Sequence, residues 1–125
     1  MKTYGYLLGD EEIAGGEKLK VKSPYSGETA AFVCLADEKV YEKAIKKAQD
    51  AAPALARLRS YDRYEILSKA AAQVAKRANE LAGTIALEGG KVIRLAEGEV
   101  ARCANTLTLA AEEAKRIHGD VLSLD

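Results

Sequence analysis

The sequence predicts a mostly α-helical fold of the α+β class, in which a small N-terminal antiparallel sheet is followed by three helices. Alanine supplies 23 of the 60 apolar residues, whereas tryptophan is absent and phenylalanine occurs once. That composition favours closely packed helices over an aromatic core. Apolar residues alternate with charged ones near the N-terminus, and from Asp37 onward they recur with the helical period. We therefore expect a β segment over residues 1–36 and a three-helix segment over residues 37–125.

The β segment contains short strand patterns joined by turn-forming residues. Residues 3–8 and 11–14 flank a Gly-Asp turn pair, which predicts a hairpin. Residues 18–22 alternate charged and apolar side chains, as in a strand with one solvent-exposed face. The turn-forming run 23–28 leads into an apolar strand at 29–35. A sheet this small needs a partner surface to be stable.

The first two helices have recognisable starts and ends. Asp37 is a suitable N-cap for the first helix, which we expect to end near Ala52 because Pro53 interrupts the pattern. Ser60 is expected to cap the second helix. Gly89-Gly90 should end it, because glycine readily adopts the left-handed conformation beyond a helix.

The third helix is predicted from about Val92 to His118, with Gly119 as the first residue beyond it. Such a helix is a rod of roughly 40 Å, too long to bury its apolar face against two other helices and a small sheet. Leu95 and Leu109 also lie off the main apolar face. We therefore expect an exposed apolar surface that another domain or a second copy covers, so residues 1–125 form a single partial domain.

Charge and cysteine content limit the classes of partner. Nineteen basic residues balance nineteen acidic ones, which argues against nucleic acid and anionic membrane as partners. No apolar run is long enough for a membrane span, and no signal peptide is visible, so we expect a cytoplasmic location. Cys34 and Cys103 are expected to be free thiols. Cys103, within the apolar face of the third helix, is expected to be a small buried residue rather than a nucleophile, and so is Cys34 on its strand.

Nucleotide and metal motifs are missing, and a few residues remain as candidates. No G-x-G-x-x-G or H-E-x-x-H pattern occurs, and the one histidine, His118, is expected to have a structural role in the last helical turn. Glu88 lies at the negative end of the second helix, which leaves solvent exposure, an ion pair with Lys91 or a bound cation as alternatives. Arg102 is three residues after Glu99. This spacing favours a surface ion pair with Glu99. The alternative is that Arg102 binds a carboxylate or phosphate of a substrate.

Several segments in order resemble the aldehyde dehydrogenase superfamily over essentially the whole chain. Ser-Pro-Tyr-Ser-Gly-Glu at 23–28, followed by an apolar strand and Ala-Asp, resembles the early N-P-x-T-G-E segment of that family. Leu-Glu-Gly-Gly-Lys at 87–91, Glu-Val-Ala-Arg at 99–102 and the alanine- and glutamate-rich run 110–114 match its next two helices. His-Gly-Asp at 118–120 fits the exit from the third helix.

The resemblance implies that the chain is the N-terminal segment of an enzyme that oxidises aldehydes to acids with NAD or NADP. In that family the aldehyde forms a thiohemiacetal on a cysteine, hydride passes to the nicotinamide, and a glutamate activates water. The resemblance places those groups outside this stretch, and neither Cys34 nor Cys103 matches the nucleophile. The segment is therefore expected to be inactive alone, with no catalytic or cofactor-binding residue, and to form the outer helical layer of the cofactor-binding domain.

The resemblance also implies two site residues and a substrate class. Glu88 resembles an acidic residue that holds a structural monovalent cation with backbone carbonyls near Val21 and Lys22. Arg102 resembles an arginine that contacts the substrate phosphate in the non-phosphorylating glyceraldehyde-3-phosphate branch. The Glu-Val-Ala-Arg pattern is also similar to lactaldehyde dehydrogenases, so a small hydroxylated or phosphorylated aldehyde is expected. The alternative is a free-standing helical interaction module that oligomerises or docks on a partner.

Overall fold

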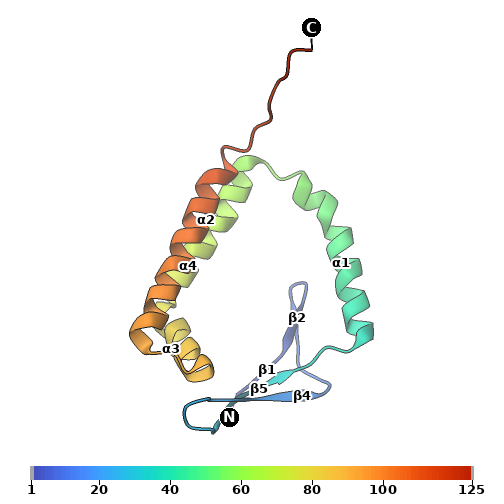
Figure 1. Ribbon diagram of the computed structural model, residues 1–125. Helices are drawn as coiled ribbons and strands as arrows, with labels where there is room; N and C mark the ends of the chain where they lie inside the picture. The colour runs from blue at the N-terminus through green and yellow to red at the C-terminus, as the bar shows by residue number, and fades with distance from the viewer. Residues whose placement is uncertain (1, 125) are drawn as a thin grey trace. The chain divides into compact units, whose positions relative to one another are not determined.

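The computed structural model describes residues 2–124, which form two compact units. One unit contains residues 2–57 and 83–93, and the other contains residues 58–82 and 94–124. Over these described residues, five short strands precede four helices, so the predicted mostly α class is confirmed (Figure 1). The helices are α1 (Glu38–Ala56), α2 (Ser60–Lys76), α3 (Ala78–Gly89) and α4 (Ile93–Ala114).

The strands form two small sheets rather than one antiparallel sheet. The predicted hairpin is present as β2 (Tyr6–Leu8) and β3 (Glu11–Ile13). A second sheet has the order β1-β5-β4, in which β5 (Thr29–Cys34) pairs antiparallel with β4 (Lys18–Lys22) and parallel with β1 (Thr3–Tyr4).

Gly5 divides residues 3–8, which the sequence predicts as one side of the hairpin. A Cβ at Gly5 would lie 2.5 Å from the backbone oxygen of Ile13, so the chain passes too close to β3 for a side chain at this point. The residues before Gly5 join one sheet and the residues after it join the other. The expectation of a purely antiparallel sheet was therefore wrong for the β1–β5 pair.

Helix α1 begins as predicted and ends later than predicted. The Asp37 carboxylate accepts a hydrogen bond from the backbone N of Val40 at 2.8 Å, which confirms Asp37 as the N-cap. The helix continues past Pro53, because a proline in the last turn removes one hydrogen bond without stopping the turn. The C-cap residue is Arg57, whose backbone N donates a hydrogen bond to the backbone oxygen of Ala54 at 3.2 Å.

The predicted second helix is divided at Arg77 into α2 and α3. Arg77 leaves helical geometry with φ −102° and ψ 18°, and its guanidinium forms two hydrogen bonds to Glu80 at 2.8 and 2.6 Å. Arg59, rather than Ser60, is the N-cap of α2. The Asp62 carboxylate accepts from the Arg59 backbone N at 3.3 Å and from its guanidinium at 2.9 and 2.7 Å. This pair satisfies the helix start, so Ser60 becomes the first helical residue.

Helix α4 ends at Ala114, before the predicted end at His118. Backbone hydrogen bonds from Lys115 to Glu112 and from Arg116 to Glu113 tighten the last turn. His118 therefore lies outside the helix, with Nδ1 2.7 Å from the backbone oxygen of Arg116. The expected positions of His118 in the last helical turn and of Gly119 just beyond it were wrong, because the backbone leaves the helix earlier.

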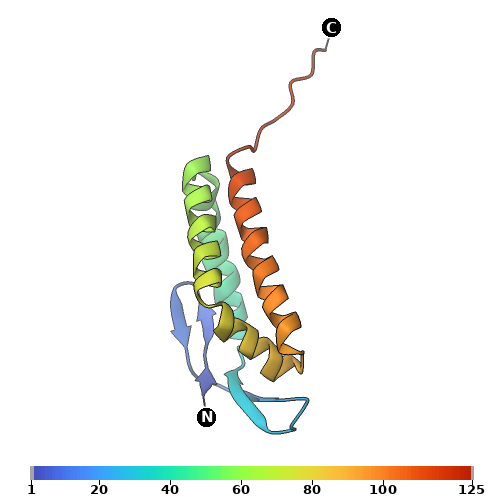
Figure 2. The ribbon, with the colours of Figure 1, turned by 90° about the vertical axis from the view of Figure 1, so that its left-hand side faces the viewer.

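Small side chains form the core of the unit that contains α2 and α4. These two helices run side by side in opposite directions (Figure 2). Alanine lets helix backbones approach closely, as the composition predicted. The buried residues are Ala71, Ala82, Ala96, Val100, Ala111 and Ala114.

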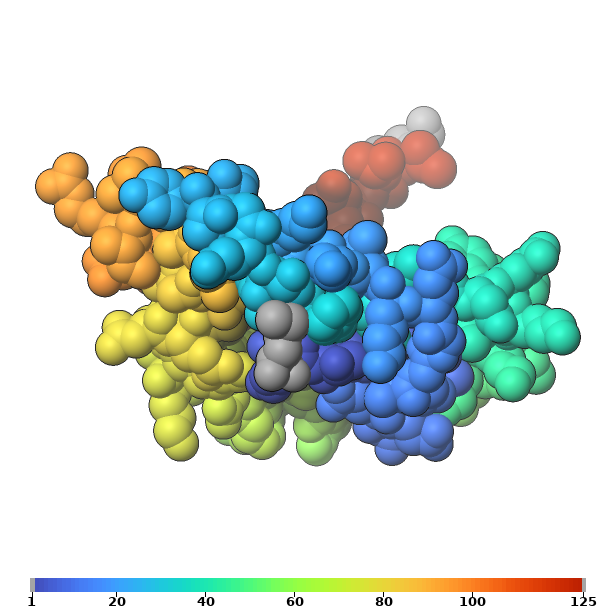
Figure 3. Space-filling model, turned by 90° about the horizontal axis from the view of Figure 1, so that it is seen from below, coloured from blue at the N-terminus to red at the C-terminus, as the bar shows by residue number. Residues whose placement is uncertain are grey.

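Helix α1 has no buried residue. Its larger apolar side chains are exposed, including Tyr41, Ile45 and Leu55, and Figure 3 shows side chains of this helix projecting from the surface. Within residues 2–124, no helix has the length and apolar character needed to cross a membrane.

Candidate functional site

The turn at residues 23–28, the first segment of the family resemblance, is held by hydrogen bonds around Ser23. Its backbone N donates to the oxygen of Glu28 at 2.9 Å, and its backbone oxygen accepts from the N of Gly27 at 2.8 Å. Its hydroxyl accepts from the N of Ser26 at 3.5 Å. Ser23 is 5% exposed, so the bonds that fix this turn are shielded from water.

Gly90 brings the end of α3 against this turn. Its φ of 64° is left-handed, and a Cβ there would lie 2.9 Å from Cγ of Pro24. Only glycine allows both the helix end and the close approach of the proline ring.

An open cavity of about 500 Å³ lies at this junction. The Ser23 hydroxyl, the Tyr25 phenol and the Lys91 ammonium supply its polar side chains, and the remaining lining is glycine and apolar. Such a surface can hold a small molecule or a neighbouring segment. The lining residues are Ser23, Tyr25, Gly83, Ala86, Leu87, Gly90, Lys91 and Val92.

Glu88 is exposed in the last turn of α3, and the cavity lining does not include it. Among residues 2–124, no group of three or more histidine, cysteine, aspartate or glutamate side chains could hold a metal ion. For a cation at Glu88, the family resemblance implies backbone oxygens as the other ligands.

Arg102 forms the surface ion pair that its spacing favours. Its Nη2 lies 3.6 Å from Oε1 of Glu99, and the Arg102 side chain is 75% exposed. Pairs of this kind contribute little to stability, and the guanidinium keeps most of its donors open to solvent. Glu88 and Arg102 belong to different compact units.

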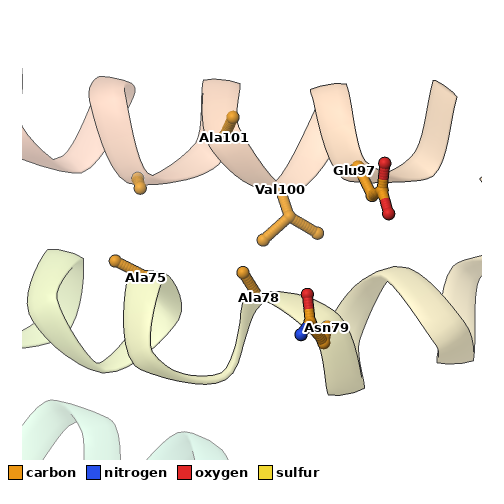
Figure 4. Close-up of a pocket in the computed structure, with 7 residues that line it drawn as sticks. Ala75, Ala78, Asn79, Glu97, Val100 and Ala101 are labelled. Carbon is orange, nitrogen blue, oxygen red and sulfur yellow. The ribbon is translucent and has the colours of Figure 1, made fainter. Parts of the chain in front are cut away.

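A second cavity, of about 370 Å³, lies within the unit that contains α2 and α4. In Figure 4, Val100 projects from α4 toward Ala78 and the end of α2. Asn79 and Glu97 are its only lining residues with polar side chains, so we interpret it as a gap between small side chains rather than as a reaction site. Its lining is Ala75, Ala78, Asn79, Glu97, Val100, Ala101 and Ala104.

Both cysteines are free, and they differ in exposure. Cys34 is buried in β5, as predicted, but Cys103 is exposed on α4. The prediction for Cys103 was wrong because α4 turns Ala96, Val100 and Ala111 inward and leaves the neighbouring face uncovered.

Arginine–carboxylate pairs at helix starts shift the pKa values of their members. The pKa of Asp62 is lowered, mainly by its hydrogen bonds with Arg59, and the same pair raises the pKa of the guanidinium. The pKa of Arg77 is raised by its hydrogen bonds to Glu80. These groups stabilise local structure, and none of them lines either cavity.

The residue patterns do not predict the contact of Pro24 with Gly90, because one pattern predicts a turn and the other a helix end. The family resemblance does bring the two segments together, since it places Glu88 near the backbone carbonyls of Val21 and Lys22. The sequence feature that marks this place is the pair Gly89-Gly90 followed by Lys91. It does not indicate a phosphate-binding loop, because no predicted strand precedes it.

Comparison with known proteins identifies the family. The model of the aldehyde dehydrogenase family matches residues 12–125. A curated relative, the 3-sulfolactaldehyde dehydrogenase of Priestia aryabhattai, is 41% identical over 120 residues, which cover 96% of this chain and 25% of the relative. The same dehydrogenase of Priestia megaterium matches equally well, and the chain spans about a quarter of the length of these curated relatives.

Solved structures agree with this assignment. Aldehyde dehydrogenase 21 of Physcomitrella patens, in complex with its reaction product succinate, matches with a TM-score of 0.96 and 38% identity over 99% of this chain and 26% of its own. The glyceraldehyde-3-phosphate dehydrogenase GapN of Methanocaldococcus jannaschii, complexed with NADP, matches with a TM-score of 0.85 and 30% identity, over 90% of this chain and 25% of its own. Family model, curated relative and solved structures all cover nearly the same stretch, and the chain belongs to the aldehyde dehydrogenase family.

Proposed function

We propose that this chain is the N-terminal part of an NAD(P)-dependent aldehyde dehydrogenase that oxidises a small hydroxylated or phosphorylated aldehyde to its acid. The observation that supports this most is the match of nearly the whole chain to a dehydrogenase of 3-sulfolactaldehyde. Sulfolactaldehyde and glyceraldehyde 3-phosphate are both three-carbon 2-hydroxyaldehydes with an anionic group at the far carbon. An aldehyde of this chemical class is the proposed substrate.

In this proposal, residues 1–125 form a structural layer rather than the reaction centre. The nicotinamide cofactor, the nucleophilic cysteine and the base belong to the rest of the parent enzyme. That remainder is also the proposed partner, covering apolar side chains exposed here, such as Leu95 and Leu109. Neither nucleic acid nor membrane is a proposed partner, and the proposed location is the cytoplasm.

The mass of the native protein in its source cells tests this proposal. An antibody against the exposed segment 38–56 should detect a species several times heavier than 13.4 kDa. The captured protein should reduce NAD or NADP with sulfolactaldehyde, lactaldehyde or glyceraldehyde 3-phosphate. A native species of 13.4 kDa without such activity would contradict the proposal.

Arg102 is proposed to contact the anionic group of the substrate. Its support is the family resemblance together with an Arg102 side chain that is 75% exposed. In the complete enzyme, Arg102→Ala should raise KM for glyceraldehyde 3-phosphate about 10- to 100-fold, the range expected for one hydrogen bond to a charged group. Propionaldehyde, which has no anionic group, should keep its KM.

Arg94→Ala is the matched control, since Arg94 is an exposed arginine on the same helix. It should leave both KM values unchanged, and Arg102→Lys should restore part of the binding. Equal changes in KM for the two aldehydes in Arg102→Ala would show that Arg102 does not contact the anionic group of the substrate.

Glu88 is proposed to hold a structural monovalent cation together with backbone carbonyls near Val21 and Lys22. Its support is the family resemblance together with an exposed carboxylate in the last turn of α3. In the complete enzyme, sodium or potassium chloride should raise the Tm above that in N-methylglucamine chloride at equal ionic strength. Glu88→Gln should abolish this difference and Glu97→Gln should retain it; retention in Glu88→Gln would contradict the site.

A free-standing helical interaction module is the second candidate, favoured by the absence of buried residues in α1. It requires a native species of 13.4 kDa that forms a stable oligomer with a cooperative thermal transition. A monomer that binds hydrophobic dye strongly would contradict this candidate.

A further inference from the structure

Lys47 on α1 reaches the turn of the β2–β3 hairpin, 39 residues earlier in the chain. Its Nζ donates to the backbone oxygen of Leu8 at 3.2 Å and lies 3.9 Å from Oε1 of Glu11. Leu8 and Glu11 are the paired residues on either side of the two-residue turn. One ammonium group therefore contacts both strands at the point where the hairpin closes.

The lysine side chain lies along the turn as well as touching its ends. A Cβ placed on Gly9 would be 3.5 Å from both Cδ and Nζ of Lys47, which is ordinary van der Waals distance. Leu8 is 7% exposed, so its carbonyl has little access to water. A charged donor at such a carbonyl forms a stronger bond than a neutral one.

Apolar packing contributes little to the attachment of α1. No α1 residue is buried, and Tyr41 and Leu55 are 66% and 63% exposed. Strand β2 contacts α1, and in Figure 3 blue atoms of the N-terminal residues lie against the green-blue atoms of α1. Because so little apolar surface is buried, a single charge-assisted hydrogen bond supplies a large share of the free energy that holds the hairpin against α1.

We propose that Lys47 is a charge-dependent attachment that holds the β2–β3 hairpin against α1, so that removal of this one positive charge releases the hairpin. The inference rests on contacts within one compact unit and is independent of the proposed enzymatic function.

Amide hydrogen exchange of the 125-residue chain tests the attachment. Lys47→Met keeps the apolar stem and removes the charge, whereas Lys47→Arg keeps the charge. In Lys47→Met, exchange of residues 6–13 should increase about tenfold or more, the factor expected for loss of one hydrogen bond to a charged group. In Lys47→Arg the increase should be clearly smaller, because a charged donor remains.

Lys46→Met is the matched control, because Lys46 is the adjacent α1 lysine and pairs within the helix, with Asp50 at 3.2 Å. It should leave exchange of residues 6–13 within about twofold of the parent chain. Protection of α4 should stay constant in every variant, which separates hairpin release from general unfolding. An unchanged hairpin in Lys47→Met, an equal increase in Lys46→Met, or a hairpin increase matched by lost α4 protection would each overturn the proposal.

Discussion

Gly90 connects two segments that lie far apart in the sequence. It ends α3 in a left-handed conformation, and its missing side chain lets Pro24 approach. The left-handed backbone and the close approach of Pro24 each require glycine at this position. Gly89 beside it has no left-handed backbone, and a Cβ added to it would have no neighbouring atom within 4 Å. The two glycines therefore have different roles.

Alanine at the two positions should have opposite effects on stability. Gly90→Ala should lower the free energy of unfolding by about 1–3 kcal/mol, because it combines the cost of a left-handed non-glycine residue with overpacking against the proline ring. Gly89→Ala should raise it by up to about 1 kcal/mol, because alanine favours the helix. Urea unfolding of both variants measures the difference, and equal effects would refute the assigned roles.

Asp62 should show the clearest pH response at the residue scale. Its folded-state pKa lies below the ordinary value of 3.8 because Arg59 donates to the carboxylate. The contribution of the pair to stability is therefore present above pH 3.8 and is lost as the pH falls through the lower folded-state pKa.

An NMR titration of the Asp62 carboxyl carbon measures this shift directly. In the parent chain the midpoint should lie below 3.8, and Arg59→Gln should return it toward that value. A midpoint that does not move in Arg59→Gln would show that Arg59 is not the cause.

Helices α1 and α4 differ in what holds them. Helix α4 buries Ala96, Val100, Ala111 and Ala114, whereas α1 buries none of its residues. Helices in proteins draw most of their stability from such packing. Helix α1 instead has its N-cap, local ion pairs such as Lys46–Asp50 and the Lys47 contact with Leu8.

Amide exchange should therefore be faster in α1 than in α4 in the chain alone. Peptides covering residues 38–56 should lose protection under conditions in which residues 93–114 remain protected. Hydrogen-exchange mass spectrometry at neutral pH makes the comparison within one sample. Equal protection of the two helices would mean that contacts other than the N-cap, the local ion pairs and the Lys47 contact stabilise α1.

The helix boundaries show where sequence patterns lose information. Val74, Ala78 and Leu81 continue the apolar spacing across Arg77, so the pattern predicts one helix where the structure has α2 and α3. The break depends on the Arg77 backbone and on the Arg77–Glu80 pair. Asp37, in contrast, was predicted correctly because an N-cap bond is local.

Across the whole molecule, large apolar side chains remain exposed in both units. Leu95 and Leu109 on α4 are 59% and 66% exposed, and Leu19 on β4 is 53% exposed. Exposed apolar side chains that lie together are typical of interaction sites. The chain spans about a quarter of the length of the relatives it matches.

Leu109→Gln should separate a role in association from a role in stability. Because Leu109 is mostly exposed, the substitution should change the free energy of unfolding by no more than about 0.5 kcal/mol in the chain alone. Binding of a hydrophobic dye should decrease in the same variant. Leu107→Gln is the comparison, since Leu107 is partly buried and its replacement should be destabilising. Destabilisation by Leu109→Gln equal to that by Leu107→Gln would contradict this assignment.

The sequence by itself determined the mostly α class, the hairpin, the N-cap at Asp37, the Arg102–Glu99 pair and the family. These features depend on residues close together in the chain or on motifs in a fixed order. Tertiary structure alone decided which segments meet: the parallel β1–β5 pair, the contact of Pro24 with Gly90, and the exposure of Cys103. The physical reason is that burial and close approach depend on neighbours distant in sequence, and local periodicity carries no information about them.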